Sequence, residues 1–173
     1  MRHVHALPFL IIAACLPGVV AAQWTVSSAG TPAVVTATLR ERADSRAFDE
    51  RAIALVIRCA ALQLDAFLTT RDALDSDMVG DILVRVEADS LRPRDSRWQA
   101  TRSNAGAFIP QNEVRDVIQR GILRSRELRI TVPTLHRGRV VHVFLVAGFS
   151  AALEALRAAC PGDRGAALAE QTR

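Results

Sequence analysis

Two neighbouring segments decide the fold of this chain: AIALVIRC at residues 52–59 and LQLDAFLT at residues 62–69. In both, apolar residues occupy every second position, which is the period of a β-strand with one buried face. Only two residues separate the segments, so we predict a hairpin, although Ala60-Ala61 is poor turn chemistry. The alternation places Cys59 on the buried face of the first strand.

Further segments carry the same alternation or a strongly apolar run. They lie at 34–39, 82–87, 98–102, 128–132 and 139–147. Polar loops at 72–77 and 92–96 bracket the second of these segments. The segment 139–147 is the most apolar part of the chain after the N-terminal region, so we expect it to be a central strand.

Two segments in the C-terminal half change to the period of a helix. Apolar residues recur at three- and four-residue spacing from Asn112, a plausible N-cap, to Ile122. A second helix begins near Ser150 and ends at Pro161. Its apolar stripe is Phe149, Leu153, Leu156 and Cys160. The sequence therefore predicts an α+β domain with a mostly antiparallel sheet of about seven or eight strands and two late helices.

The N-terminus has the pattern of an export signal. Arg2 precedes an apolar stretch at 7–16, Pro17-Gly18 break the helix, and Val20-Ala21-Ala22 offers small residues for cleavage. We predict a signal peptide at 1–22, one domain at 23–161 and a flexible tail at 162–173. A second interpretation remains open, in which Ile12-Ala13-Ala14-Cys15 is a lipobox and Cys15 is lipidated. Either outcome places the domain outside the cytoplasm, and we expect the periplasm.

Cysteine usage agrees with export. Cys15 leaves with the signal, so Cys59 and Cys160 remain as an even pair in an oxidising compartment. We predict a disulfide between them, which would clamp the last helix onto the sheet. Closing a loop of about 100 residues stabilises a fold by about 4–5 kcal/mol in the chain-entropy model.

Composition excludes several classes of function. The chain has 173 residues, 50% of them hydrophobic, with a net charge of +4. All 22 basic residues are arginines and there is no tyrosine, so neither a Lys nucleophile nor a Tyr general acid is available. The charge is too mild and scattered to predict nucleic-acid binding. After the signal, no apolar run is long enough for a transmembrane helix.

The residue patterns of catalysis and metal binding are missing. The mature chain has two histidines, His136 and His142, without the GxSxG or HExxH motifs that would accompany them in a hydrolase. The acidic run at 72–81 fails the EF-hand pattern, because Val79 stands at its fifth position and Val86 at its twelfth. We therefore predict no catalytic residues, no metal and no cofactor.

Arginines concentrate late in the chain. The candidates for partner binding are Arg124, Arg126, Arg129, Arg137 and Arg139. On a hairpin edge they would contact an acidic partner or an anionic envelope surface. Arginine also has to solubilise this lysine-free chain, and edge strands commonly carry such charges, so both interpretations stand.

A set of core motifs follows the signal peptide in order. They are Trp24, LVIRC at 55–59, VRVE at 84–87, Trp98, AF at 107–108, FLVAG at 144–148 and AALEALRAAC at 151–160. This chain thereby resembles the VasI-like proteins associated with bacterial type VI secretion, and their stand-alone exported relatives, over residues 23–160. The resemblance implies a fold and an accessory role, and it implies no catalytic residues.

These observations predict a non-enzymatic exported accessory protein that binds envelope proteins and is linked to type VI secretion. The alternative is a periplasmic sensor of a small molecule or glycan, with a pocket between sheet and helices near Trp98 and Phe108. A third interpretation, a hydrolase that uses His142, has the least in its favour.

Overall fold

The computed structural model describes residues 24–30, 34–41, 53–89 and 91–160, and its strands form one antiparallel sheet. The strands are β1 Thr25–Ala29, β2 Val34–Arg40, β3 Ala54–Ala60, β4 Gln63–Thr69, β5 Asp81–Ala88, β6 Leu91–Ala100, β7 Gly106–Phe108, β8 Glu127–Thr134 and β9 Gly138–Leu145. Their order in the sheet is β1-β2-β3-β4-β7-β6-β5-β8-β9. The predicted α+β class is confirmed, with nine strands in the described residues instead of seven or eight. The predicted signal at 1–22 and tail at 162–173 lie outside those residues.

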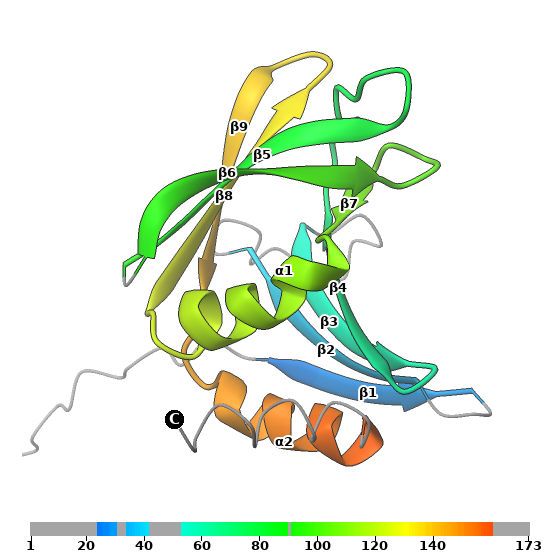
Figure 1. The fold of residues 1–173 in the computed structure, drawn as a ribbon, viewed down its shortest axis with the longest axis vertical. Helices are drawn as coiled ribbons and strands as arrows, with labels where there is room; N and C mark the ends of the chain where they lie inside the picture. Colours follow the sequence, from blue (N-terminus) through cyan, green and yellow to red (C-terminus); the bar gives the residue numbers. More distant parts are fainter. Residues whose placement is uncertain (1–23, 31–33, 42–52, 90, 161–173) are drawn as a thin grey trace, which may run out of the picture.

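The sheet bends into two halves, which β7 connects (Figure 1). Strands β1–β4 form the first half, and β6, β5, β8 and β9 form the second. Helix α1 (Gln111–Asp116) continues into the π-helical segment η1 (Val117–Ile122), and together they pack between the halves against β4, β5 and β8. Helix α2 (Phe149–Ala159) packs against β1, β2 and β3.

The predicted hairpin at residues 52–69 is confirmed as β3 and β4. Its strands pair from Ala54 opposite Thr69 to Ala60 opposite Gln63, so the turn contains only Ala61 and Leu62. Both turn residues have positive φ angles, 49° and 64°. This conformation matches the twist of the flanking strands, and Asn or Gly normally provides it. The strands therefore pair despite the unfavourable turn residues.

The C-terminal helix confirms the predicted clamp. The four residues of its apolar stripe, Phe149, Leu153, Leu156 and Cys160, are all buried. Cys160 forms a disulfide with Cys59 of β3, with a Cα–Cα distance of 5.8 Å. At the other end of the helix, the Phe149 ring packs 4.5 Å from the Trp24 ring. Helix α2 is thus fixed at both ends to the N-terminal half of the sheet.

The segment 92–96, predicted as a loop, instead belongs to strand β6. Pro93 cannot donate a ladder hydrogen bond, so a strand accommodates it only at an edge or at an irregular pairing. In the structure, β6 pairs with β7 only at Gln99 and Ala100, so the stretch around Pro93 has a strand on one side only. The register also shifts between Val86 and Ala88, which is the kind of irregular pairing that accommodates proline.

Two smaller expectations are wrong. The segment 139–147 becomes β9, which stands last in the strand order instead of at the centre. Its alternate residues are still buried because the bent sheet brings the β2 end close to it, so that Glu41 contacts His142. Asn112 does not cap the first helix: Pro110 holds the N-cap position, and no side chain caps it.

Candidate functional site

The structure places four of the five predicted partner-binding arginines at two ends of the β8–β9 hairpin. Arg124 and Arg126 precede β8, Arg137 lies in the turn that follows it, and Arg139 is the second residue of β9. An eight-residue strand is about 25 Å long, so these side chains do not form one patch. Only Arg129 lies within β8 itself.

Two of these arginines are already engaged. Arg129 donates from Nε to Glu127 at 2.6 Å, and this hydrogen bond raises the pKa of the guanidinium above its ordinary value. Arg137 pairs with Asp72. The side chains of Arg124 and Arg139 are exposed and have no hydrogen bond or ion pair within the described part of the chain. Arg139 is the better placed of the two for a partner, because it lies on a sheet face.

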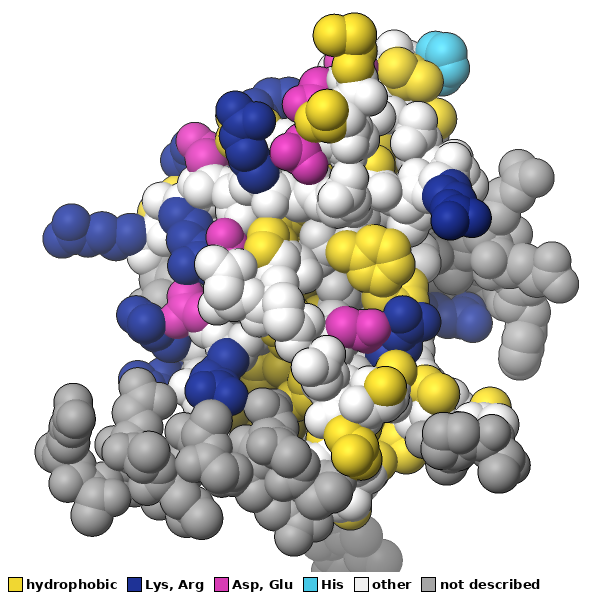
Figure 2. Space-filling model, turned by 45° about the vertical axis from the view of Figure 1, so that its right-hand side comes forward, with side chains coloured by type: hydrophobic (Ala, Val, Ile, Leu, Met, Phe, Trp, Pro, Cys, Tyr) yellow, Lys and Arg dark blue, Asp and Glu magenta, His cyan; other side chains and the backbone are white. Residues whose placement is uncertain are grey.

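That face, which we call the outer face, consists of the alternate residues of β6, β5, β8 and β9 whose side chains point away from the core. Its members include Leu83, Arg85, Arg97, Arg129, Arg139 and Val141. It carries the exposed apolar residues Leu83 and Val141, which are 48% and 50% exposed. Arg85 lies two residues from Leu83 on β5, Arg129 lies on the neighbouring β8, and both form ion pairs with acids of the same face. Figure 2 shows one side of the molecule, where hydrophobic side chains are interspersed with arginines and acids instead of gathered in one broad patch.

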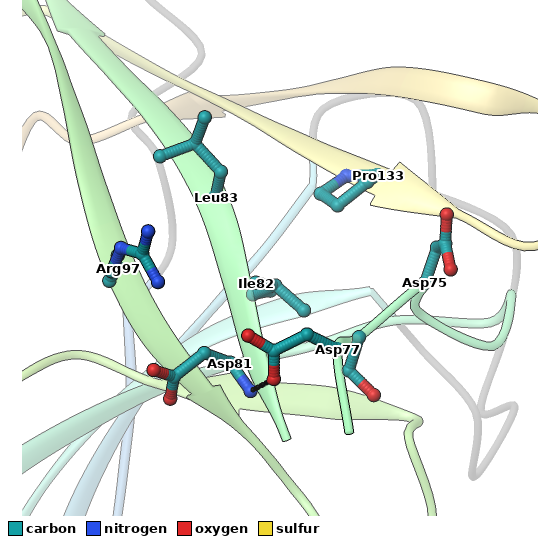
Figure 3. Close-up of a pocket in the computed structure, with 8 residues that line it drawn as sticks. Asp75, Asp77, Asp81, Ile82, Leu83, Arg97 and Pro133 are labelled. Carbon is teal, nitrogen blue, oxygen red and sulfur yellow. Dashed lines mark hydrogen bonds between the residues drawn. The ribbon is translucent and has the colours of Figure 1, made fainter. Parts of the chain in front are cut away.

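A cavity of about 410 Å³ opens on the outer face. Leu83, Pro133 and Arg97 form part of its wall, and an acidic loop that contains Asp75 and Asp77 forms the other part (Figure 3). One oxygen of Asp77 accepts the backbone amides of Val79 and Asp81. The acidic run therefore shapes a turn. Across residues 24–30, 34–41, 53–89 and 91–160, no group of three His, Cys, Asp or Glu side chains could hold a metal ion.

A second cavity, of about 210 Å³, lies on the helix side of the sheet. Its floor is apolar, with Val86, Val117 and Gly121, and its charged wall consists of Arg92, Arg94, Arg120 and Asp116. We call it the arginine pocket. It lies where the β5–β6 hairpin meets the π-helical segment, and such segments occur frequently at functional sites.

Ion pairs fix two arginines of the arginine pocket. Arg94 donates to Asp116 at 2.8 Å and to Glu113 at 3.0 Å. Arg120 approaches the other oxygen of Asp116, at 2.5 Å. The hydroxyl of the buried Ser96 donates to Glu113 at 2.8 Å. The third guanidinium, Arg92, is exposed and has no partner among the described residues.

The two histidines differ in environment. His136 is exposed in the β8–β9 turn, whereas His142 is 2% exposed. His142 Nδ1 lies 3.1 Å from Oε1 of the buried Glu41, and the same oxygen accepts the backbone amide of Val143. No local sequence pattern predicts this pair, since 101 positions separate its members. A histidine held in this way, away from solvent, is not positioned to meet a substrate.

Asp89 fixes the entry into β8. Its two carboxylate oxygens accept the backbone amides of Arg126 and Glu127 at 2.8 and 3.0 Å. Partial burial acts to raise the pKa of Asp89, but the hydrogen bonds from Arg126 and Glu127 outweigh it and lower the pKa below its ordinary value. This carboxylate links the turn after β5 to the start of β8.

The aromatic pair expected to line a ligand pocket is not brought together. Trp98 is fully buried in the core, and its Nε1 has no hydrogen-bond partner within the described segments. Phe108 points to the opposite face, where its ring lies 5.4 Å from that of Phe67. Neither residue lines the two cavities described above.

Comparison with known proteins supports the fold alone. No protein-family model and no curated protein matches the chain, so the VasI-like resemblance is not confirmed. The chain is similar to the crystal structure of invasion associated protein B from Bartonella henselae, with 16% identity and a TM-score of 0.52. The match covers 80% of this chain and 94% of that one. Within the described residues, no helix is long and apolar enough to cross a membrane.

Proposed function

We propose that this chain is a non-enzymatic exported accessory protein that binds another protein of the cell envelope. The observation that carries the proposal is the outer face, where Leu83 and Val141 are exposed among arginines. Protein interfaces combine an apolar centre with arginine and a polar rim in this way. The burial of His142 agrees with a role that does not involve catalysis.

An oxidising compartment is the second part of the proposal. Disulfides form and persist mainly in oxidising compartments, which the bond between Cys59 and Cys160 supports, and the N-terminal pattern predicts export. The fold similarity to an invasion-associated protein is consistent with an exported accessory role. We place the protein in the periplasm, either free after cleavage at Ala22 or anchored through a lipidated Cys15.

The link to type VI secretion rests on the sequence resemblance over residues 23–160. Under this proposal the partner is a subunit of that secretion machine on the envelope side. An acidic surface on the partner would complement Arg97 and Arg139, which have no ion-pair partner in the described residues.

The test is a cross-linked capture of the tagged, exported protein from its native cell envelope, identified by mass spectrometry. The variants Leu83→Glu/Val141→Glu and Arg97→Glu/Arg139→Glu are compared with Leu62→Glu, which changes an exposed residue in the β3–β4 turn. Because a charge buried in an interface without a partner is costly, we expect the first pair to lose the partner.

Recovery of the same envelope proteins by all variants would contradict the outer face as the contact region. If the leucine–valine variant loses the partner and the arginine variant keeps it, the outer face is the contact region but its arginines do not contribute to binding. If secretion-machine subunits are recovered and the outer-face variant loses them, the type VI assignment is supported. If the proteins that depend on the outer face include no such subunit, that assignment is refuted.

The alternative function, a periplasmic sensor of a small molecule or glycan, is favoured by one observation. The arginine pocket is an open cavity with fixed charged side chains, although it lies away from Phe108 and does not include Trp98. Its volume is below the roughly 300 Å³ at which pockets for drug-sized ligands begin, so a sugar chain would not fit.

A further inference from the structure

We propose that the arginine pocket binds a small phosphate-bearing anion. Three guanidinium groups converge on one cavity from two elements, with Arg92 and Arg94 on β6 and Arg120 on η1. Guanidinium is the side chain best suited to bind a tetrahedral oxyanion, because its planar N–H groups donate in pairs. This function is independent of the outer face and goes beyond the binding of an envelope protein.

The charge of the site favours an anion. Its members are Arg92, Arg94 and Arg120 against Glu113 and Asp116, which leaves one net positive charge. That excess is carried by Arg92, which has no hydrogen bond or ion pair in the described segments. A bound anion would complete a network in which every other charged group already has a partner.

The acids hold the arginines in place before any ligand binds. Asp116 receives Arg94 on one oxygen and Arg120 on the other, and Glu113 receives Arg94 together with Ser96. Both carboxylates lie on helix α1, whose buried residue Val114 anchors it to the core. Side chains that are held in this way lose less conformational entropy on binding, which increases affinity.

The geometry favours phosphate over carboxylate. Donors approach the cavity from β6 on one side and from η1 on the other, so a ligand needs acceptors in more than one plane. A phosphate group presents tetrahedral oxygens and up to two charges, whereas a carboxylate presents two coplanar oxygens and one charge. A cavity of about 210 Å³ holds a phosphate head with a short substituent. The phosphate group can belong to a free metabolite or to an envelope lipid.

The experiment is isothermal titration of the exported protein, disulfide intact, with inorganic phosphate, glycerol phosphate and acetate, followed by flotation with vesicles that contain phosphatidic acid. Arg92→Ala is the test variant, because Arg92 has no described partner whose loss would unfold the protein. Arg97→Ala is the matched control, an exposed and unpaired arginine of the same strand on the outer face.

We expect phosphate and glycerol phosphate to bind and Arg92→Ala to weaken this binding about tenfold or more, as for a charge-assisted hydrogen bond. Arg97→Ala should leave it unchanged. Vesicle binding that requires Arg92 would identify a lipid as the source, and binding of soluble phosphates alone would identify a metabolite. The proposal is overturned by wild-type protein that binds no phosphate, by equal binding of acetate, or by Arg92→Ala that binds as wild type.

Discussion

The two helical segments of this domain cover the same bent sheet but are attached to it by different physics. Helix α2 is fixed to β3 by the disulfide and to Trp24 by ring packing. The α1–η1 segment also buries an apolar stripe, but its solvent side is held to β6 by ion pairs from Arg94 to Glu113 and Asp116. The attachment of α2 is covalent and buried, whereas the attachment of α1–η1 consists of ion pairs that are accessible to solvent.

This difference explains why the cavity with a binding chemistry lies beside α1–η1 and not beside α2. The ion pairs of α1–η1 hold arginines at a half-exposed surface, where a ligand can reach their remaining N–H groups. The disulfide of α2 is buried and offers a ligand no hydrogen-bond donor. The molecule therefore has a rigid half, which carries the clamp, and a half in which charged groups are arranged around a pocket.

The largest expected effect comes from removal of the clamp. Cys59→Ala/Cys160→Ala should lower the free energy of unfolding by about 4 kcal/mol, because the disulfide closes a loop of about 100 residues. Urea unfolding measures the change, and amide exchange should accelerate in α2 more than in α1. A reductant should destabilise the wild type and leave the variant unaffected. An equal acceleration of amide exchange in α1 and α2 would contradict the difference between the two attachments.

A smaller loss in the free energy of unfolding is expected when the ionic attachment is removed. Glu113→Ala leaves the buried Ser96 hydroxyl without its acceptor and should cost about 1–3 kcal/mol in urea unfolding. Glu154→Ala is the matched control, because Glu154 is an exposed helical residue paired only with Arg157 among the partners described here, and it should cost below about 0.5 kcal/mol. Equal losses in the two variants would show that the network around Glu113 has no special role.

The smallest change in the free energy of unfolding should come from a substitution of Asp89, and this change should depend on pH. Because the pKa of Asp89 is lowered in the folded protein, its stabilisation is present above the unfolded pKa and disappears as the pH falls through the folded pKa. Asp89→Asn should therefore cost up to about 1 kcal/mol at pH 7 and nothing in strong acid. Urea unfolding at both pH values checks this, with Asp95→Asn as the control. A loss that stays constant with pH would contradict it.

Patterns that repeat along the sequence predicted most of the fold. Alternation identified β3, β4, β5 and β8, and the three- and four-residue spacing identified the buried stripe of α2. The disulfide followed from an even pair of cysteines on two buried faces. Strand β1 was missed because all five of its residues are exposed, which gives no alternation. Strand β7 was missed because it has only three residues.

The candidate sites were harder to predict because they depend on contacts between distant segments. Arg92 and Arg94 fall in the polar segment 92–96 that is predicted as a loop, and no local pattern indicates that Asp116 and Arg120 of the helix meet them. Glu41 and His142 pair only because the sheet bends. Four of the five arginines chosen by their closeness in sequence lie at two ends of a hairpin, because a strand separates its two ends by its full length.

The contact between Glu41 and Val143 has a consequence for how copies of this protein behave at high concentration. Strand β9 is the last strand of the sheet, and it exposes Val141 two residues from Val143. An edge strand of this kind can pair with a strand from another molecule. A recruited strand would need the Val143 amide, and Glu41 already accepts its hydrogen. One buried carboxylate from the opposite end of the sheet thereby removes one of the hydrogen bonds that such a strand would form.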